Sequence, residues 1–403
     1  MYRAVRRLCA VLHKRKRGVG LADKNNMINV IDEFDYSTQG GAYNESFRKW
    51  RKKKDNAYAY SFEKNQNEIV YVDGRGFIEK SAVEAEKNVL SRIFNKVGLA
   101  MLIWIAFDDV ICRITVSVLD ICGVNIHTNF FSSMIYGGNV EMAAVLIVSA
   151  LIKMTVPLIF LHCVFKLPRR AEIMHKMNDP KALIGAIAMT FIVCTAVSIP
   201  TAYSSETKEF YEIFSGLDAD VSVWTQKEFV IYTVFHVIIL PIISELFFRG
   251  AMFNVLRQFG DLFAVIMTSL IAGMLTQDLR SMPAVILISL VSSFGMLGSG
   301  TIFTAIAVNI VYKMYDLTLI IIENDHTSKM PLSRNIFMIL ALLVGVAMLA
   351  VYRKTASDAA KKKIAGYASE LSQGMRILHS AKTFPFSAVA SLCLLSAVIR
   401  AVL

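Results

Sequence analysis

The feature that most constrains this chain is a succession of apolar runs that begins near residue 95 and continues almost to residue 403. Each run approaches the roughly 20 residues that an α-helix needs to cross a bilayer. Lipid offers no hydrogen-bond partners to the backbone, so runs of this length predict membrane-spanning helices. The predicted spans lie near residues 97–121, 143–165, 182–203, 229–248, 262–276, 283–298, 301–322, 335–352 and 384–402.

The composition agrees with a membrane class. Hydrophobic residues make up 55% of the 403, and the whole chain has only 8 prolines and 21 glycines, which leaves room for long uninterrupted helices. The six cysteines are scattered without a Cys-x-x-Cys pair, which argues against a disulfide framework or a zinc finger. We therefore predict an all-α, polytopic transmembrane helical bundle with eight or nine spans.

The placement of charge predicts an orientation. The net charge is +11, and the excess lies at the N-terminus, in loop 166–181 and after residue 352, which the positive-inside rule assigns to the cytoplasm. Loop 204–228 is acidic and is expected outside. These assignments predict a multi-pass protein of the cell membrane with a cytoplasmic N-terminus. No basic stripe alternates with aromatic residues, so the lipid bilayer, not nucleic acid, is the expected partner.

Four regions follow from these patterns. Residues 1–92 are expected to form a basic, largely flexible cytoplasmic region, with a β-hairpin near Ile69–Gly74 because Asp-Gly favours a tight turn. Residues 93–180 hold the first two spans and the basic loop, and 181–322 form a membrane core. Residues 323–403 hold the C-terminal spans and a cytoplasmic amphipathic linker helix within 355–380. Whether 384–402 spans the bilayer or lies at its surface stays open.

One short segment, Pro241 to Gly250, carries the strongest chemical signal. Glu245 and Arg249 are four residues apart in an apolar run, so they share one face of a helix and can pair. Ionisable groups at membrane depth are costly and by default indicate a functional site. The alternative is purely structural: an arginine that anchors the cytoplasmic end of a helix and a glutamate that neutralises it. Pro241 is expected to kink this helix.

Two motifs resemble the CPBP family (CAAX proteases and bacteriocin-processing enzymes, also called Abi). Ser244-Glu-Leu-Phe-Phe-Arg-Gly250 is similar to the family's Glu-Glu-x-x-Phe-Arg-Gly, and Gly300 to Asn309 is similar to its later helix. The resemblance implies a CPBP-like core over residues 181–322. It also implies an intramembrane metalloprotease, in which a glutamate acts as base on a water molecule held by histidines and an asparagine.

The catalytic positions of that family are degenerate in this chain. Ser244 stands for the first glutamate, and Leu275 (or Thr276 in a shifted register) stands for the first histidine. Asn309 replaces the second histidine, and Lys313 replaces the asparagine. Glu245 and Arg249 are the remnants of the motif. We expect no metal, and zinc only if the chain is an active protease.

Three functions remain open. The first is a catalytically degenerate homologue, a pseudoenzyme that binds or scaffolds a membrane peptide or protein. The second is an active but diverged intramembrane endopeptidase that uses Glu245 as base. The third is a small-solute transporter that uses Asp108, Asp109 and Lys153.

Three further expectations concern charged and titratable side chains in the spans. Lys313 is predicted to form an ion pair with Glu245, with Arg249 completing the network. An ion pair is predicted between the first two spans, from Asp108 or Asp109 to Lys153. The two histidines within spans, His162 and His236, are expected to be core residues rather than metal ligands.

Overall fold

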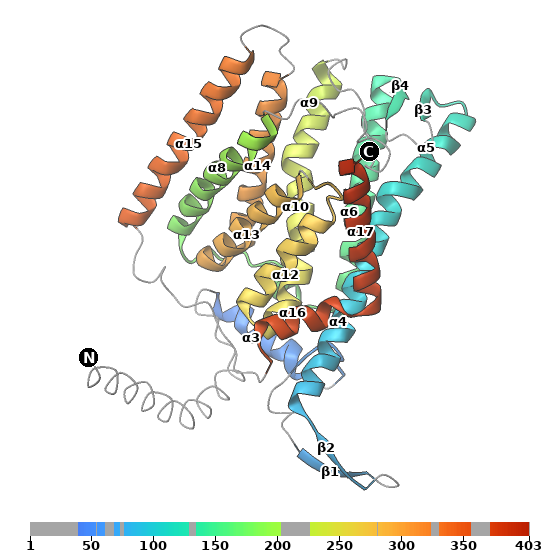
Figure 1. Cartoon of the computed structure of the whole chain (residues 1–403), viewed down its shortest axis with the longest axis vertical. Helices are drawn as coiled ribbons and strands as arrows, with labels where there is room; N and C mark the ends of the chain where they lie inside the picture. Colours follow the sequence, from blue (N-terminus) through green and yellow to red (C-terminus); the bar gives the residue numbers. More distant parts are fainter. Residues whose placement is uncertain are drawn as a thin grey trace.

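The long helices of this protein run side by side between two ends of a bundle (Figure 1). The structure, a computed structural model, describes residues 39–53, 55–60, 68–72, 76–128, 134–202, 226–279, 281–323, 330–355 and 371–402. Strands occur only as two short hairpins in these ranges. The predicted all-α membrane bundle is confirmed at this level.

Six helices are long and apolar enough to cross a bilayer. They are α6 (Asn139–Phe165), α8 (Pro180–Ala202), the helix Lys227–Phe259, α13 (Ser281–Ser299), α14 (Ile302–Glu323) and α15 (Met330–Thr355). A seventh candidate is the bent pair of α16 (Gln373–Ala381) and α17 (Phe384–Val402), whose axes differ by 82°. The predicted count of eight or nine spans is therefore not confirmed.

Two of the nine predicted spans are not among these seven candidates, because one helix carries several charged residues and the other is short. The first belongs to a continuous helix of α4 (Ala82–Ile105), a π-helical segment η2 (Ala106–Ile111) and α5 (Cys112–Ile121), which carries Asp108, Asp109 and Arg113 at its centre. The other is α12 (Asp261–Met274), which has 14 residues. At 1.5 Å per residue α12 is about 21 Å long, less than the ~30 Å of a hydrocarbon core.

Two antiparallel hairpins interrupt the helices. The predicted one pairs β1 (Glu68–Val72) with β2 (Gly76–Lys80), and its turn lies outside the described residues. The other pairs β3 (Ile126–Thr128) with β4 (Ile135–Gly137) between α5 and α6. We did not predict the second hairpin, because strands of three residues give too little alternation to recognise.

Part of the N-terminal region, which its composition predicted to be largely flexible, is folded in the described residues. The helix α3 (Gly41–Lys52) buries Tyr43, Phe47 and Trp50, whose rings stack in sequence at 5.5–5.8 Å between centroids. The indole of Trp50 donates a hydrogen bond of 2.8 Å to the carbonyl of Phe165 at the end of α6. Aromatic residues at helical spacing gave α3 an apolar face that the charge pattern of the region concealed.

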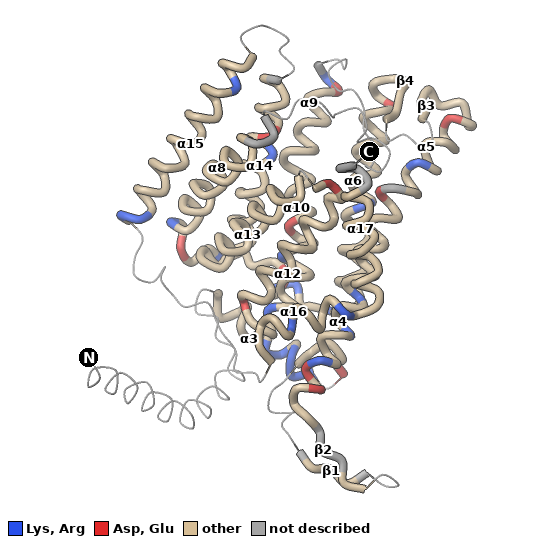
Figure 2. The backbone as a smooth tube through the Cα atoms, in the orientation of Figure 1, with Lys and Arg blue, Asp and Glu red and all other residues tan. Residues whose placement is uncertain are grey.

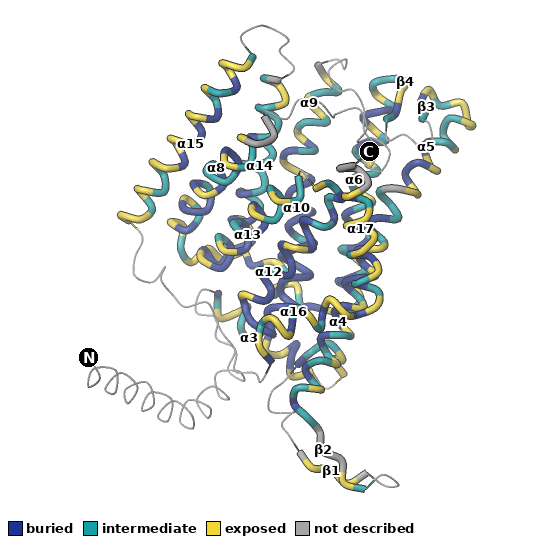
Figure 3. Tube along the Cα trace, in the orientation of Figure 1, coloured by how far each residue is buried: buried dark blue, intermediate teal, exposed yellow. Residues whose placement is uncertain are grey.

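The described part of the chain has three groups of buried hydrophobic residues (Figure 3). The largest lies where α4, α6, the helix Lys227–Phe259, α12 and α17 meet. A second lies where α8 packs against α13, α14 and α15, and a third joins α5 and the β3–β4 hairpin to α6. At the crossing of α4 and α17 a Cβ on Gly98 would lie 2.5 Å from the backbone nitrogen of Phe386. Only glycine therefore permits this close approach.

The C-terminal region is fixed to the same end of the bundle as α3. Arg376 of α16 donates a hydrogen bond of 2.7 Å to Glu86 of α4, and both side chains are buried. The same guanidinium donates to the carbonyl of Phe259 at 2.8 Å. The predicted linker helix within 355–380 lies largely outside the described residues, and α16 is the part that the structure shows.

Candidate functional site

The site is built on a helix that changes its hydrogen-bond register several times. Within Gln226–Phe259 the segments are α9 (Gln226–Val234), π-helical η5 (Phe235–Ile239), α10 (Leu240–Glu245), π-helical η6 (Leu246–Phe253), α11 (Asn254–Leu256) and 3₁₀-helical η7 (Arg257–Phe259). Pro241 lies two residues after the end of η5, in the first turn of α10. The π register there accommodates the proline, which cannot donate the normal i→i−4 bond, and the helix continues as one span.

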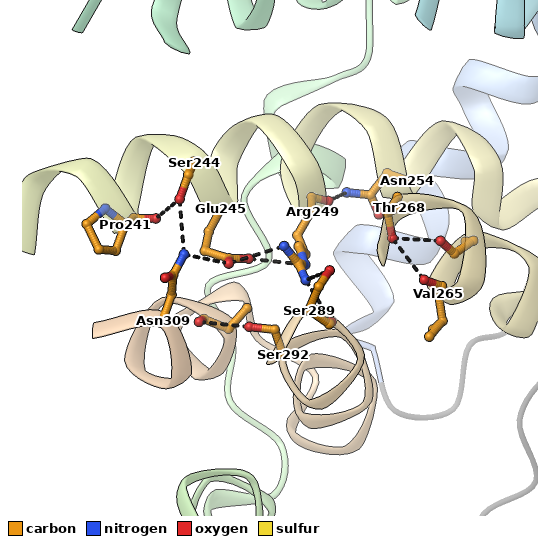
Figure 4. Close-up of polar contacts among 12 residues, drawn as sticks. Pro241, Ser244, Glu245, Arg249, Asn254, Val265, Thr268, Ser289, Ser292 and Asn309 are labelled. Atoms are coloured by element: carbon orange, nitrogen blue, oxygen red, sulfur yellow. Dashed lines mark hydrogen bonds and ion pairs between the residues drawn. The ribbon is translucent and has the colours of Figure 1, made fainter. Parts of the chain in front are cut away.

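Glu245 and Arg249 form a buried ion pair at the start of η6 (Figure 4). Nη1 of Arg249 donates to Oε1 of Glu245 at 3.2 Å, and Nε lies 3.2 Å from Oε2 without the alignment of a hydrogen bond. Each side chain is 2% exposed. The sequence prediction that these two residues pair is thus reproduced, with the spacing of one helical turn as its cause.

Asn309 of α14 is the second partner of the carboxylate. Its Nδ2 donates to Oε1 of Glu245 and to Oγ of Ser244, each at 3.1 Å (Figure 4). Ser244 in turn donates to the carbonyl of Pro241 at 3.0 Å. The carboxylate is therefore held by one cation and one amide, which stabilise its ionised form in place of the water it has lost.

Arg249 has partners on two sides. Its Nη2 donates to the hydroxyl and the carbonyl of Ser289 on α13, at 2.6 and 2.7 Å. The amide of Asn254 donates to the carbonyls of Arg249 and Gly250 at 2.9 and 2.8 Å. The guanidinium is thus held by Glu245 and by Ser289 of α13, so its position does not depend on Glu245 alone, while Asn254 holds the backbone of the same turn.

The predicted ion pair between Lys313 and Glu245 is wrong. No hydrogen bond or ion pair joins the two side chains among the described residues, and the Lys313 ammonium lies 5.5 Å from the centroid of the Tyr312 ring. Asn309 is one turn closer to Glu245 on the same helix and occupies the place that Lys313 was expected to fill. Asp316, three residues further on, is the acidic group that attracts Lys313.

The other degenerate position, Leu275, lies at the end of α12 and is buried in the hydrophobic core. Its aliphatic side chain offers no lone pair to a metal or a water molecule. Of the histidines, His162 contacts Glu172 at 2.7 Å, and His236 stacks on Tyr232 at 5.6 Å between centroids. Neither makes a contact with Glu245 in the described part of the chain.

The donor set does not fit the zinc ion that the family resemblance implies. Zinc sites use imidazole, thiolate and carboxylate ligands, usually at least three from the protein. Around Glu245 the neighbours are a hydroxyl, an amide and a guanidinium, and the guanidinium stands where a second positive charge would be repelled. No group of three His, Cys, Asp or Glu able to hold a metal occurs in the described ranges.

The charges of the first two spans come together as predicted. Nζ of Lys153 donates to Oδ1 of Asp108 at 2.8 Å, and it lies 5.7 Å from the centroid of the Trp104 ring. Both charged side chains are about one-fifth exposed, at 22% and 17%. Asp108 lies in η2, which packs against α6.

Three residues of the site were not predicted from the sequence. Ser289 belongs to a small-residue stretch of α13 that resembles ordinary helix packing. Asn254 accepts a hydrogen bond from Tyr43, although the two residues are 211 positions apart in the sequence. Of these three residues, only Asn254 had a signal in the sequence: it is a polar residue in an apolar helix, five positions after Arg249.

Comparison with known families agrees with this location. Residues 226–315 match the model of the family described as Type II CAAX prenyl endopeptidase Rce1-like. The matched segment contains Ser244, Glu245, Arg249 and Asn309, so the resemblance that the motifs indicated is confirmed for the segment that forms the site. Curated proteins and solved structures gave no match to the chain.

Proposed function

We propose that this chain is a CAAX-protease-like membrane protein that has lost proteolysis and uses the core around Glu245 to bind a membrane peptide. The observation that carries the proposal is the engagement of the Glu245 carboxylate by Arg249 and Asn309. A general base must accept a proton from a nearby water molecule, and a carboxylate that is paired with a buried guanidinium has little tendency to do so.

The lost positions act together in the reaction that the resemblance implies. That reaction needs a second carboxylate and two imidazoles, and here Ser244, Leu275 and Asn309 stand in their places. Residues that act as a unit fail together, so the loss of one member already removes most of the rate. What remains is a membrane core with a fixed, buried polar centre, which supports a binding or scaffold role.

The test is an assay of the full chain in lipid nanodiscs with two peptides, one prenylated and one with an unmodified membrane-inserting sequence. We expect no cleavage product by mass spectrometry with or without added zinc, while an active CAAX protease cleaves the prenylated peptide in parallel. Fluorescence anisotropy should show saturable binding of one peptide. Cleavage that is lost in Glu245→Gln would establish the active-peptidase alternative, and absence of binding to either peptide would overturn the binding role.

The transporter alternative has less support. Lys153 and Asp108 form a closed ion pair, which is the arrangement of a structural contact. A carrier site would instead need a charged side chain that is available to bind a solute or an ion.

We also propose nine crossings, with the N-terminus in the cytoplasm of a cell membrane. Counting the α4–α5 helix, α12 and α17 as crossings places loop 166–179 and residues 371–383 on one side and the β3–β4 hairpin on the other. This parity agrees with the distribution of basic residues.

A further inference from the structure

The helix α3 presents two different faces. One face is buried and aromatic, with Tyr43, Phe47 and Trp50 packed on the bundle. The other carries Arg48, Lys49, Lys52 and Lys53, all exposed. Burial of the aromatic face thus fixes the direction in which the four cations point.

Loop 166–179 lies beside α3. It joins two spans, α6 and α8, so its 14 residues cannot move far from the membrane surface. The short helix α7 (Arg169–Glu172) within it packs against α3. The edge of Tyr58 also meets the ring of Phe165 at 5.2 Å, which ties the segment after α3 to the end of α6.

Together the two segments form a basic surface, which we name the α3–α7 surface. Figure 2 shows Lys and Arg gathered at the end of the bundle where α3 lies. Two exposed apolar side chains, Ile173 and Met177, lie among them. The exposed cations are Arg48, Lys49, Lys52, Lys53, Lys166, Arg169, Arg170 and Lys176, and the exposed carboxylates in the same segments are Glu45 and Asp55.

The buried face of α3 reaches the site through a chain of hydrogen bonds. Arg257 donates to the hydroxyl of Tyr43 at 3.3 Å, and Tyr43 donates to Oδ1 of Asn254 at 2.8 Å. The amide nitrogen of Asn254 then donates to the carbonyls of Arg249 and Gly250 in η6. The segment after α3 adds a second contact, because the backbone nitrogen of Tyr60 donates to Gln258 at 2.8 Å.

We infer that the α3–α7 surface binds the headgroups of anionic phospholipids, and that this binding stabilises the π-helical segment η6 that carries Arg249. Anionic lipids attract cations that lie within a Debye length of the membrane surface. The exposed Ile173 and Met177 suit the boundary between headgroups and acyl chains. A ligand that orders α3 must also favour the state in which Tyr43 holds Asn254, because the two faces belong to one helix.

The position of the surface favours lipid over nucleic acid. Two candidate spans flank loop 166–179, which keeps its cations within a short distance of the plane of the headgroups. The inference does not rest on peptide binding, and it can fail or hold independently of that role.

The experiment compares the full chain in nanodiscs of phosphatidylcholine alone and with phosphatidylserine. We expect phosphatidylserine to slow hydrogen exchange of amides 246–256 about tenfold and to be retained in native mass spectra. Neutralising four of the eight cations of the surface (Arg48→Gln, Lys52→Gln, Arg169→Gln, Arg170→Gln) should strongly weaken both effects, because each cation near the surface contributes to lipid attraction.

A matched control neutralises four exposed cations at the same end of the bundle but on other elements, Arg92, Arg353, Lys354 and Lys382. This variant should keep the lipid effect, and an equal loss would show that only net charge matters and would overturn the proposal. Inorganic phosphate or inositol hexakisphosphate added to phosphatidylcholine discs should give no protection. If either reproduces the effect, the ligand is a soluble phosphate and the assignment to lipid is wrong.

Tyr43→Phe tests the connection to the site. It removes the hydroxyl that donates to Asn254 and leaves the ring in place. We expect phosphatidylserine to remain bound while its protection of amides 246–256 falls to less than twofold. Tyr71→Phe, on the exposed β1–β2 hairpin, is the control and should behave as the wild type. Full protection in Tyr43→Phe would refute the coupling.

Discussion

The amide of Asn309 lies 3.1 Å from the carboxylate of Glu245, although the two residues are 64 positions apart. This contact joins α14 to the helix that carries the motif, and it completes the shell of Glu245 that Arg249 begins. The carboxylate is thus fixed by groups from two helices. Its surroundings are those of a structural ion pair, and they determine how the protein should respond to substitution.

Removing one partner of the buried pair should cost more than removing both. Arg249→Met leaves an uncompensated carboxylate in the interior and should lower the free energy of unfolding by roughly 3–5 kcal/mol. Adding Glu245→Leu should recover much of that loss. Thermal or denaturant unfolding of the wild type, both single variants and the double variant in one detergent gives the coupling energy.

The exposed pair Glu45–Lys49 has the same i,i+4 spacing and serves as the control. Its side chains are 60% and 75% exposed, so solvent screens their attraction. The same cycle there should show no measurable coupling. Additive effects at Glu245 and Arg249 would mean that the two side chains do not interact in the folded protein.

Asn309 offers a test of charge at the site. Asn309→Leu should lower stability by about 1.5–3 kcal/mol, because a hydrogen bond to a charged group is lost. Asn309→Asp has nearly the native shape but places a second carboxylate against Glu245, so it should be worse than Asn309→Leu at neutral pH. Unfolding midpoints of the two variants decide the order. An Asp variant as stable as the wild type would show that Glu245 carries no charge.

Arg376 should be essential for attachment of the C-terminal region. Arg376→Met leaves Glu86 buried without its cation and also frees the carbonyl of Phe259. We expect a loss of roughly 3–5 kcal/mol and faster exchange of amides in α16. The matched change Lys382→Met, at an exposed position just beyond α16, should have little effect. Unchanged exchange in Arg376→Met would contradict this role.

The contribution of the Tyr43 hydroxyl to the free energy of unfolding should be constant around neutral pH. Burial raises the pKa of the Tyr43 phenol above its ordinary value of 10, and the neighbouring Arg257 only partly offsets this. A group whose pKa is raised on folding stabilises the protein fully below its unfolded pKa, and the benefit falls as pH rises through the folded pKa. The stability difference between wild type and Tyr43→Phe should therefore be flat from about pH 6 to 9 and shrink only above about 10. A difference that changes between pH 6 and 8 would point to another titrating group.

Natural cysteine positions allow the orientation to be measured. Cys122 is exposed beside the β3–β4 hairpin, on the side expected outside. A membrane-impermeant maleimide should label Cys122 in intact cells and should fail to label it in Cys122→Ser. A cysteine introduced at His175, in loop 166–179, should react only after permeabilisation. The reverse pattern would invert the proposed topology.

The sequence was most informative about features that depend on local spacing. Apolar runs predicted most of the helices, and the i,i+4 spacing predicted the pair of Glu245 with Arg249. The Asp-Gly turn predicted the first hairpin. In each case the cause lies within one element, so no knowledge of neighbouring elements was needed.

Contacts between distant elements were harder to predict. Lys313 was assigned to Glu245 because its charge was suitable, but the register of α14 places Asn309 nearer. The tail containing α3 was expected to be flexible because its basic residues dominate the composition, while three aromatic residues determine its packing. Charge and composition do not specify which helix faces lie against each other. That depends on packing across the whole bundle.

The two π-helical segments, η5 and η6, have a consequence for how this stretch can vary. A π turn holds one residue more than an α turn, so deleting one residue from Phe235–Ile239 should return that turn to α geometry and leave Glu245 with little net rotation relative to α9. The same deletion in an ordinary α turn, such as one in α9, would rotate the preceding part of the helix by about 100° relative to the site. The orientation of Glu245 and Arg249 is thus protected against the loss of one residue in the π-helical stretch. Related chains should therefore tolerate a one-residue difference in length here better than in the neighbouring α-helical turns.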